Sequence, residues 1–337
     1  MTDGQSGLRD RHFLVRTPNW LGDAVMSLPA VRAIKERAGR LTIMAPKFLW
    51  DLYEGIADDS ADAKVPLREA IAAIKQRMPD TVVLFQNSLY SAIVQRLAGC
   101  RDIWGYRTGG RGPLLSRPVA PPRNIYQSHQ VYYHWNLAVR LGMAGGEPRM
   151  LIEPRGESLL DRSSAWIGMG PGARYGEAKR WAASSYAVTG RALAAKGFRI
   201  ALFGAETEAG NCDRVAHDIG PAALNLAGRT TIRQLIASIA RCRVFVSNDS
   251  GTQHIASAAG VPVVAIFGST EPRSTAPFNR PSTVLRRALP CSPCHRRVCP
   301  IDHRCMTRIH TEEVVSAAMR MAALSPFQPP EASSQQE

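Results

Sequence analysis

Apolar runs and stretches of helical periodicity alternate along the first half of the chain. The apolar runs predict four strands, at His12–Arg16, Leu41–Ala45, Thr81–Phe85 and Ile103–Tyr106. Amphipathic periodicity predicts helices at Ala24–Arg37, Leu67–Arg77, Ser88–Leu97 and His129–Leu141. This alternation is typical of an α/β domain with a parallel sheet.

The same rhythm restarts after a segment rich in glycine and proline, Gly142–Gly156. Further strands are predicted at Trp166–Met169, Arg199–Phe203, Val244–Ser247 and Val261–Phe267. Further helices are predicted at Ser184–Lys196, Thr207–Asp218, Ile232–Arg241 and Thr252–Ala259. The fold class is therefore α/β, with two sequential halves.

The length of the chain, 337 residues, also favours two domains. We expect an N-terminal domain at residues 1–150, a C-terminal domain at 151–325 and a disordered tail at 326–337. Parallel sheets bind ligands beyond the carboxyl ends of their strands, so the loops after each strand are the places to look for chemistry.

Charge and hydropathy narrow the possible partners. The net charge of +14 favours phosphates, nucleic acid or an anionic lipid surface, although a merely solvated basic surface gives the same number. No basic block is interleaved with aromatic residues, which disfavours nucleic acid. The first eleven residues lack the apolar core of a secretory signal, and no apolar run approaches the roughly 20 residues that cross a bilayer. We therefore expect a cytoplasmic protein that does not span the membrane.

The first predicted strand leads into the sequence Asn19-Trp20-Leu21-Gly22-Asp23 and then a helix. Asp23 beside the helix start would be kept ionised by the helix dipole and could take a proton from a sugar hydroxyl. The alternative is a plain N-cap aspartate. The loop lacks the GxGxxG pattern of dinucleotide-binding domains.

Two loops of the second half could hold a diphosphate. Gly170–Trp181 combines glycines with Lys179, and backbone amides and a lysine of this kind bind phosphates, although a solvated turn looks the same. Asn248–His254 opens a helix whose free amides favour an anion. Here the alternative is that Asp249 or Ser250 caps the helix and His254 packs on its first turn. No Walker motif is present.

Five segments in this order resemble glycosyltransferase family 9, and the resemblance spans about His12 to Ala323. They are NWLGDAVMSLPA at 19–30, PGARYGEAKRW at 171–181, FGAETE at 203–208, NLAG at 225–228 and NDSGTQHIASA at 248–258. The resemblance implies a GT-B fold, with two Rossmann-like domains facing across a cleft. It implies an inverting transfer of heptose from ADP-heptose, held by the C-terminal half, to an acceptor held by the N-terminal half.

The resemblance also implies roles for individual residues. Asp23 matches the general base, and Lys179 matches the lysine that stabilises charge on the departing ADP. The positions that match donor-binding residues are Gly172, Glu208, Leu226, Gly228, Asp249, Ser250, Gly251 and His254. Among them, Asp249 would lie near the heptose, Glu208 near the ribose or sugar, and Leu226 and Gly228 near the adenine. Asn19 and Trp20 would contact the acceptor.

The implied acceptor is a phosphorylated, Kdo-bearing lipid A core at the anionic cytoplasmic face of the inner membrane. The long loop Arg107–Gln127 supplies candidate cations for it, namely Arg107, Arg111, Arg117 and Arg123. A solvated loop is the alternative. The chain shows no DxD motif, so we expect catalysis without a metal or other cofactor.

Four cysteines gather in one segment, Cys291, Cys294, Cys299 and Cys305, with His295 and His303 between them. In a cytosolic protein this clustering favours a structural zinc site, with an iron–sulfur cluster or free thiols as alternatives. Two rival functions remain open: a basic nucleic-acid-binding protein supported by such a metal site, and a sugar-nucleotide epimerase or another family 9 transferase.

Overall fold

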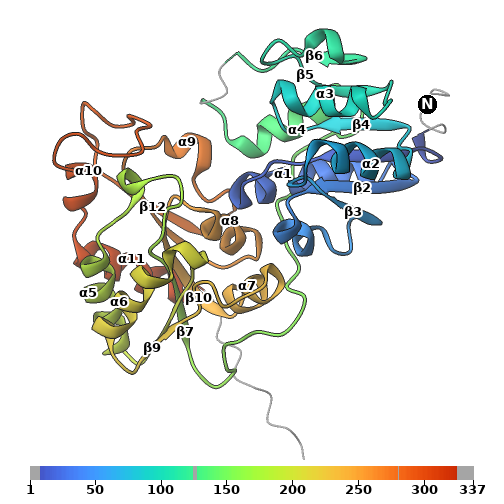
Figure 1. Ribbon diagram of the computed structural model, residues 1–337. Coiled ribbons are helices and arrows are strands. Elements are labelled where there is room, and N and C mark those ends of the chain that lie inside the picture. Colours follow the sequence, from blue (N-terminus) through green and yellow to red (C-terminus); the bar gives the residue numbers. More distant parts are fainter. Residues whose placement is uncertain (1–7, 124–126, 280, 325–337) are drawn as a thin grey trace, which may run out of the picture. The chain divides into compact units, whose positions relative to one another are not determined.

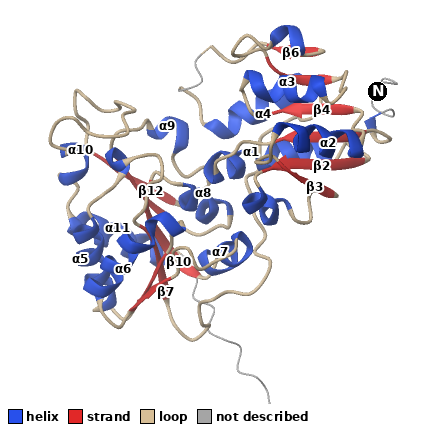
Figure 2. Cartoon of the chain, viewed as in Figure 1, coloured by secondary structure: helices blue, strands red, loops and turns tan. Residues whose placement is uncertain are grey.

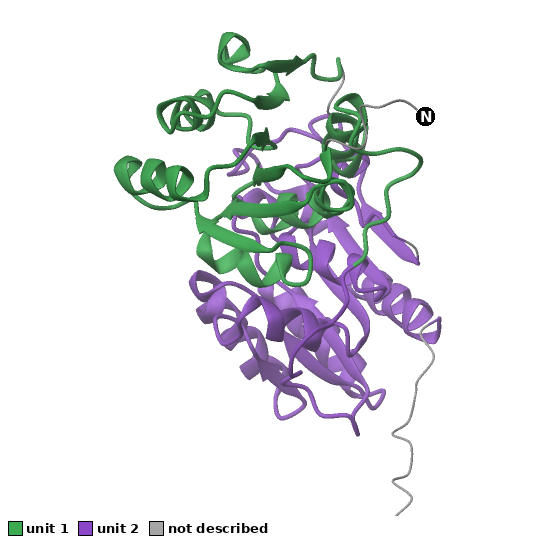
Figure 3. Cartoon of the chain, turned by 90° about the vertical axis from the view of Figure 1, so that its right-hand side faces the viewer, with its two compact units in different colours: residues 1–151 green, residues 152–337 purple. Residues whose placement is uncertain are grey.

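The computed structural model describes residues 8–123, 127–279 and 281–324 (Figure 1). The chain forms two compact units, residues 1–151 and 152–337 (Figure 3). The division falls inside the segment Gly142–Gly156. The tail expected at 326–337 lies outside the described residues.

The first unit is a parallel sheet of six strands in the order β3-β2-β1-β4-β5-β6 (Figure 2). Its strands are β1 (His12–Arg16), β2 (Arg40–Ala45), β3 (Asp59–Asp62), β4 (Thr81–Leu84), β5 (Ile103–Tyr106) and β6 (Arg117–Val119). Its helices are α1 (Leu21–Lys35), α2 (Leu67–Arg77), α3 (Leu89–Leu97) and α4 (Gln130–Arg140), with short 3₁₀ helices η2 (Lys47–Tyr53) and η3 (Gly112–Leu114). Side chains of α2 and α3 pack with Leu14, Val82 and Leu84 in one buried cluster.

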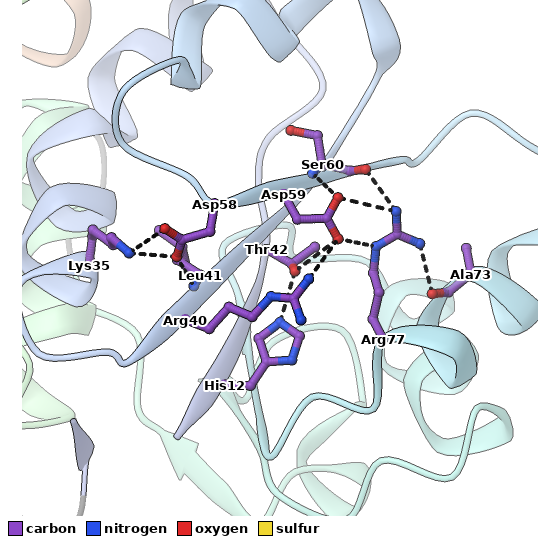
Figure 4. Close-up of polar contacts among 10 residues, drawn as sticks. All are labelled: His12, Lys35, Arg40, Leu41, Thr42, Asp58, Asp59, Ser60, Ala73 and Arg77. Atoms are coloured by element: carbon purple, nitrogen blue, oxygen red, sulfur yellow. Dashed lines mark hydrogen bonds and ion pairs between the residues drawn. The ribbon is translucent and has the colours of Figure 1, made fainter. Parts of the chain in front are cut away.

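The edge strand β3 is polar, and ion pairs hold it in place (Figure 4). Asp59 on β3 accepts from Nε of Arg77 on α2 at 2.7 Å, and Asp58 just before β3 accepts from Nζ of Lys35 on α1 at 2.7 Å. Burial opposes the ionised form of Asp59, but hydrogen bonds from Arg77 and from the Ser60 N–H, together with the positive charges of Arg77 and Arg40, outweigh it and lower the pKa of this carboxyl. Charge pairing therefore adds to the packing of the buried Ala61 at this edge.

The second unit repeats the topology of the first, with six parallel strands in the order β12-β11-β10-β7-β8-β9. Its strands are β7 (Trp166–Gly170), β8 (Arg199–Leu202), β9 (Ala223–Asn225), β10 (Cys242–Asn248), β11 (Val263–Phe267) and β12 (Ser282–Arg286). Its helices are α5 (Ala183–Ala194), α6 (Ala209–Ile219), α7 (Ile232–Ile239), α8 (Gly251–Ala258), α9 (Pro272–Thr275), α10 (Arg304–Thr307) and α11 (Thr311–Ala323). Two short 3₁₀ helices, η4 (Glu177–Lys179) and η5 (Glu206–Glu208), lie in loops that follow β7 and β8.

The core of the second unit lies between the sheet and the helices α5, α6 and α11, where side chains such as Ile167, Leu202 and Val246 are fully buried. Helices α7 and α8 lie on the other side of the sheet (Figure 1). Burial of these apolar side chains is the main term that stabilises the unit. No helix within the described ranges combines the length and the apolar character that a bilayer crossing requires.

Candidate functional site

Asp23 lies in the first turn of α1, as its third residue, and is half-buried. The N-cap position belongs to Trp20, whose side chain is 50% exposed, so the interpretation of Asp23 as an N-cap residue is wrong. A carboxylate in the first turn is stabilised by the helix dipole and by nearby backbone amides. The position therefore suits an ionised acid.

Arg16, which the sequence analysis did not single out, fixes the loop before α1. Its guanidinium donates to Oδ1 of Asn19 at 2.7 Å and to the carbonyl oxygens of Thr17 and Met44. Burial lowers the pKa of Arg16 to about 10. The signal in the sequence was a cation at the last position of an apolar strand. This arginine holds Asn19 in place, so Asn19 has a structural partner in addition to its predicted role with the acceptor.

Arg111 corrects the prediction that it contacts the acceptor from a surface loop. Its side chain is 0% exposed. It donates from Nε to the carbonyl oxygen of Tyr106 at 2.8 Å, from Nη1 to the carbonyl oxygen of Gln86, and from Nη2 to Oδ1 of Asn87 at 3.2 Å. Arg111 thus supplies donors to backbone carbonyls at the end of β5 and just after β4, in addition to the Thr108 N–H and the Ser91 hydroxyl. Burial lowers its pKa to about 10.

The other three arginines of this segment remain exposed. Arg107 follows β5 directly, at the carboxyl edge of the sheet. Arg117 begins β6 instead of lying in a loop, and its guanidinium stacks over the ring of Trp104 at 4.4 Å. Arg107 and Arg123 thus keep the exposure that their predicted role requires.

In the second unit, Lys179 and Asp249 form an ion pair. The distance from Lys179 Nζ to Asp249 Oδ2 is 2.6 Å, and the side chains are 13% and 5% exposed. Two further donors hold the same carboxylate: Thr270 Oγ1 at 2.7 Å from Oδ2, and Gln253 Nε2 at 3.1 Å from Oδ1. Every one of these residues follows a strand or opens a helix at the carboxyl edge of the sheet. Sequence reasoning missed Gln253 and Thr270, because neither stands out by type.

Asn248, the last residue of β10, connects the two predicted diphosphate loops. Its fully buried amide donates from Nδ2 to the carbonyl oxygens of Pro171 and Gly172, at 3.0 and 3.2 Å. Its Oδ1 accepts from the backbone N–H of Trp181 at 3.0 Å and from the hydroxyl of Tyr186 at 3.1 Å. One side chain thus fixes both ends of the loop that carries Lys179.

The start of α8 lacks the side-chain capping that was the alternative interpretation of Asp249 and Ser250. Ser250 is the N-cap residue, but its side chain accepts no capping hydrogen bond. Its hydroxyl lies 3.0 Å from Ser247 Oγ and 2.9 Å from Thr252 Oγ1. The carboxylate of Asp249 is bound by Lys179. The interpretation of Asp249 or Ser250 as the side chain that caps α8 is therefore wrong. Gly251 opens the helix and His254 is buried on its first turn.

The remaining predicted donor residues lie at the ends of β7, β8 and β9. A Cβ added to Gly172 would lie 2.2 Å from the carboxyl carbon of Glu208, so a larger residue there would displace the end of that side chain. One oxygen of Glu208 accepts from the N–H of Ala205 at 2.9 Å. Leu226 is buried, while Gly228 is exposed with φ +71 and its N–H donates to Gly204 O at 3.0 Å. Gly172 thus lies next to Glu208. The hydrogen bonds of Asn248 link Gly172 to the far end of the loop that carries Lys179.

The predicted metal site at the four cysteines finds no support in this structure. Within the described ranges, no three Cys, His, Asp or Glu side chains are arranged to hold a metal ion. Cys291 and Cys294 are exposed, whereas Cys305 is buried in α10, where burial and then the neighbouring thiols raise its pKa. None of the seven cysteines forms a disulfide. The spacing of the cysteines in the sequence does not determine whether the folded chain brings their thiols together.

Comparison with known proteins identifies the family. Residues 67–304 match the model of glycosyltransferase family 9 (heptosyltransferase). Lipopolysaccharide heptosyltransferase 2 of Escherichia coli (strain K12) is 30% identical over 305 residues, 81% of this chain and 87% of that protein. Lipooligosaccharide heptosyltransferase 2 of Campylobacter jejuni (serotype O:6) is 26% identical over 92% of this chain and 99% of its own.

A solved structure, that of E. coli ADP-heptose lps heptosyltransferase II, superposes with a TM-score of 0.80 at 24% identity, covering 93% of this chain and 99% of the other. The two units described above therefore have the GT-B fold, with one Rossmann-like domain each. The chain belongs to glycosyltransferase family 9, the heptosyltransferases, and is a glycosyltransferase.

Proposed function

We propose that the chain is an ADP-heptose:lipopolysaccharide heptosyltransferase II, which moves heptose from ADP-L-glycero-D-manno-heptose to the heptosyl-Kdo inner core. The observation that carries the proposal is the similarity to proteins named heptosyltransferase 2 over most of the chain. Trp20 before Leu21-Gly22-Asp23 and the sequence Ala-Lys-Arg-Trp at 178–181 resemble the same type. The family match leaves the nucleic-acid-binding interpretation without support.

In the proposed reaction, the acceptor hydroxyl attacks the anomeric carbon of the donor. A new carbon–oxygen bond forms, the bond to the diphosphate breaks, and ADP departs with inversion at the anomeric carbon. Asp23 receives the proton of the attacking hydroxyl, because a carboxylate in the first turn of α1 can act as a base.

Lys179 stabilises the negative charge that builds on the departing ADP. Its ammonium is held by Asp249, whose carboxylate is fixed in turn by Thr270 and Gln253, so the position of the lysine is set before ADP-heptose binds. Preorganised charge of this kind needs no rearrangement during the reaction. With this lysine and the amides at the start of α8, the proposed chemistry needs no divalent cation.

We further propose that the first unit binds the acceptor at an anionic membrane surface on the cytoplasmic side. Helix α3 supports this proposal, because its outward side chains Leu89, Tyr90, Ile93 and Leu97 are all exposed and apolar. The chain from Thr81 to Gly146 carries seven arginines and a single acidic residue, Asp102. An exposed apolar helix face in a cationic region is complementary to a bilayer of anionic lipids.

Two assays test the function. Mass spectrometry of the lipopolysaccharide core from a strain that lacks the gene should show truncation after the first heptose. Purified protein with ADP-heptose should extend a mono-heptosylated core and leave a de-heptosylated core unchanged. Transfer only to the de-heptosylated core would instead indicate another family 9 activity, and ADP-heptose turnover without transfer would contradict a transferase.

A further inference from the structure

The segment Cys291–Cys305, here called the cysteine segment, packs against the loop Pro171–Trp181, here called the donor loop. The N–H of Ala178 donates to the carbonyl oxygen of Arg297 at 2.9 Å, and the hydroxyl of Tyr175 donates to the carbonyl oxygen of His295 at 2.9 Å. A Cβ added to Gly176 would lie 2.4 Å from the Arg297 oxygen, so the two backbones are in direct contact. The cysteine segment thus covers the stretch that ends at Lys179.

His303 completes the contact on the other side of Ala178. Its Nε2 lies 3.0 Å from the carbonyl oxygen of Ala178. Because a carbonyl oxygen only accepts, the ring must carry its proton on Nε2. The cysteine segment therefore binds both the N–H and the C=O of the residue immediately before Lys179, which fixes the backbone from which the lysine side chain extends.

Tyr175 fixes the lysine side chain itself. The ammonium of Lys179 lies 4.8 Å from the centroid of the Tyr175 ring, and the guanidinium of Arg297 lies 5.3 Å from the same centroid. The hydroxyl bond to His295 sets the orientation of this ring. A fixed aromatic face next to an ammonium restricts where the charge can go.

The same segment also reaches the partner of Lys179. The N–H of His295 donates to the carbonyl oxygen of Ser269 at 2.7 Å, and Ser269 precedes Thr270, which donates to Asp249. Ser292 Oγ donates to the carbonyl oxygen of Gly268 at 2.6 Å in the same loop. The cysteine segment thus contacts both the loop that carries Lys179 and the loop that carries Thr270, the hydrogen-bond partner of Asp249.

We propose that the cysteine segment is the positioning element of the donor site, and that His303 and Tyr175 are positioning residues for Lys179. The inference rests on the proposed function for the identity of the ligand, a nucleoside diphosphate sugar. It assigns no contact with the reacting atoms to either residue and requires no metal at the thiols.

The test compares His303→Ala, His303→Gln and Tyr175→Phe in the full-length protein. His303→Ala should weaken ADP binding about tenfold, the effect of one lost hydrogen bond, and raise the KM for ADP-heptose similarly while the KM for the acceptor stays within twofold. His303→Gln should recover most of the affinity, because its amide N–H can reach the Ala178 carbonyl. Tyr175→Phe retains the ring and should weaken ADP binding severalfold. His310→Ala is the matched control, since His310 is exposed nearby and should change nothing.

ADP affinity is measured by calorimetry, which keeps this inference separate from the proposed function. A wild-type protein that binds ADP but transfers no heptose would refute the proposed function, and the variants would still test positioning. Unchanged ADP affinity in Tyr175→Phe and His303→Ala would overturn the inference. An equal rise in donor and acceptor KM would overturn it as well, because a general loss of structure would then explain the effect.

Discussion

The ammonium of Lys179 and the carboxylate of Asp249 lie 2.6 Å apart, with little exposure of either side chain. Lys179→Ala should therefore leave a buried carboxylate without its cation and lower the free energy of unfolding by about 3 kcal/mol. Adding Asp249→Asn removes that charge and should restore at least half of the loss. Urea unfolding of both variants measures the effect, and equal stability of wild type and Lys179→Ala would contradict it.

The same substitution should also impair catalysis. Removal of one preorganised charge at the leaving group costs roughly 100-fold to 1,000-fold in kcat. Because the double variant still lacks the ammonium, its activity should remain low while its stability recovers. This separation distinguishes a role in chemistry from a role in folding.

Asp23→Asn should lower kcat by at least about 100-fold, because an amide cannot accept the acceptor proton. The isosteric change leaves the donor residues of the second unit untouched, so ADP affinity should stay within twofold of wild type. Glu36→Gln, an exposed change at the end of the same helix, is the control. Steady-state kinetics with ADP-heptose decide the matter, and retained turnover in Asp23→Asn would remove this residue as the base.

Replacement by methionine should affect different properties at Arg111 and Arg107, the stability of the fold at Arg111 and the binding of the acceptor at Arg107. Arg111→Met removes the guanidinium from the carbonyl oxygens of Tyr106 and Gln86, which keep only the Thr108 N–H and the Ser91 hydroxyl, and should cost on the order of 3 kcal/mol of stability. Arg107→Met should change stability by less than about 0.5 kcal/mol but raise the KM for the phosphorylated acceptor. Thermal unfolding and acceptor titrations measure the two effects. If Arg111→Met were as stable as wild type, its assignment as a buried structural residue would fail.

Ile93→Asp combined with Leu97→Asp should weaken binding to phosphatidylglycerol vesicles at least about tenfold, because charge on the outward face of α3 opposes insertion. Transfer to a delipidated acceptor should not change, since neither side chain is buried. Val188→Asp, an exposed valine on α5, serves as the control. Vesicle co-sedimentation at low salt gives the measurement, and equal binding of both variants would exclude α3 as the contact.

His134 should make stability depend on pH. Burial lowers its pKa to about 4 from an ordinary value of 6.5, so the folded state keeps the ring neutral while the unfolded state takes up a proton below pH 6.5. Stability is thus complete above pH 6.5 and falls as the pH drops toward 4, by an amount on the order of 3 kcal/mol for this group. Unfolding midpoints across this window should show a smaller acid loss in His134→Phe, and identical pH profiles would contradict the assignment.

Much of the fold could be predicted because its central elements carry strong local patterns. The periodicity of Leu67–Arg77 predicts α2 with the bounds that the structure has, and β1 and β5 agree equally well. None of the four edge strands, β3, β6, β9 and β12, was predicted. Strand β3 is polar and held by ion pairs with α1 and α2, and β9 has only three residues, so neither shows an apolar run. Helix α11 was also missed, because its buried face consists largely of small alanines.

The site was less predictable, because its geometry arises from distant contacts. Loops that follow parallel strands pointed to Lys179 and Asp249, but nothing in the sequence indicated that the two would pair. In the sequence, Arg111 cannot be distinguished from an exposed loop cation. Only the structure shows that its guanidinium contacts carbonyl groups at the end of β5 and just after β4. The spacing of the four cysteines suggested a metal, whereas the structure gives them unequal exposure.

The repeated strand order places Asp23 and Lys179 at equivalent positions, each after the first strand of its own sheet. Thr270 and Gln253, which hold the partner of the lysine, belong to the second repeat, and Arg16, which fixes the loop before the acid, belongs to the first. With the acceptor assigned to the first unit and ADP-heptose to the second, as proposed above, substitutions in the first unit can change the acceptor without altering the groups that hold the donor. Related enzymes can in this way come to extend different sugar chains while they bind the same activated donor.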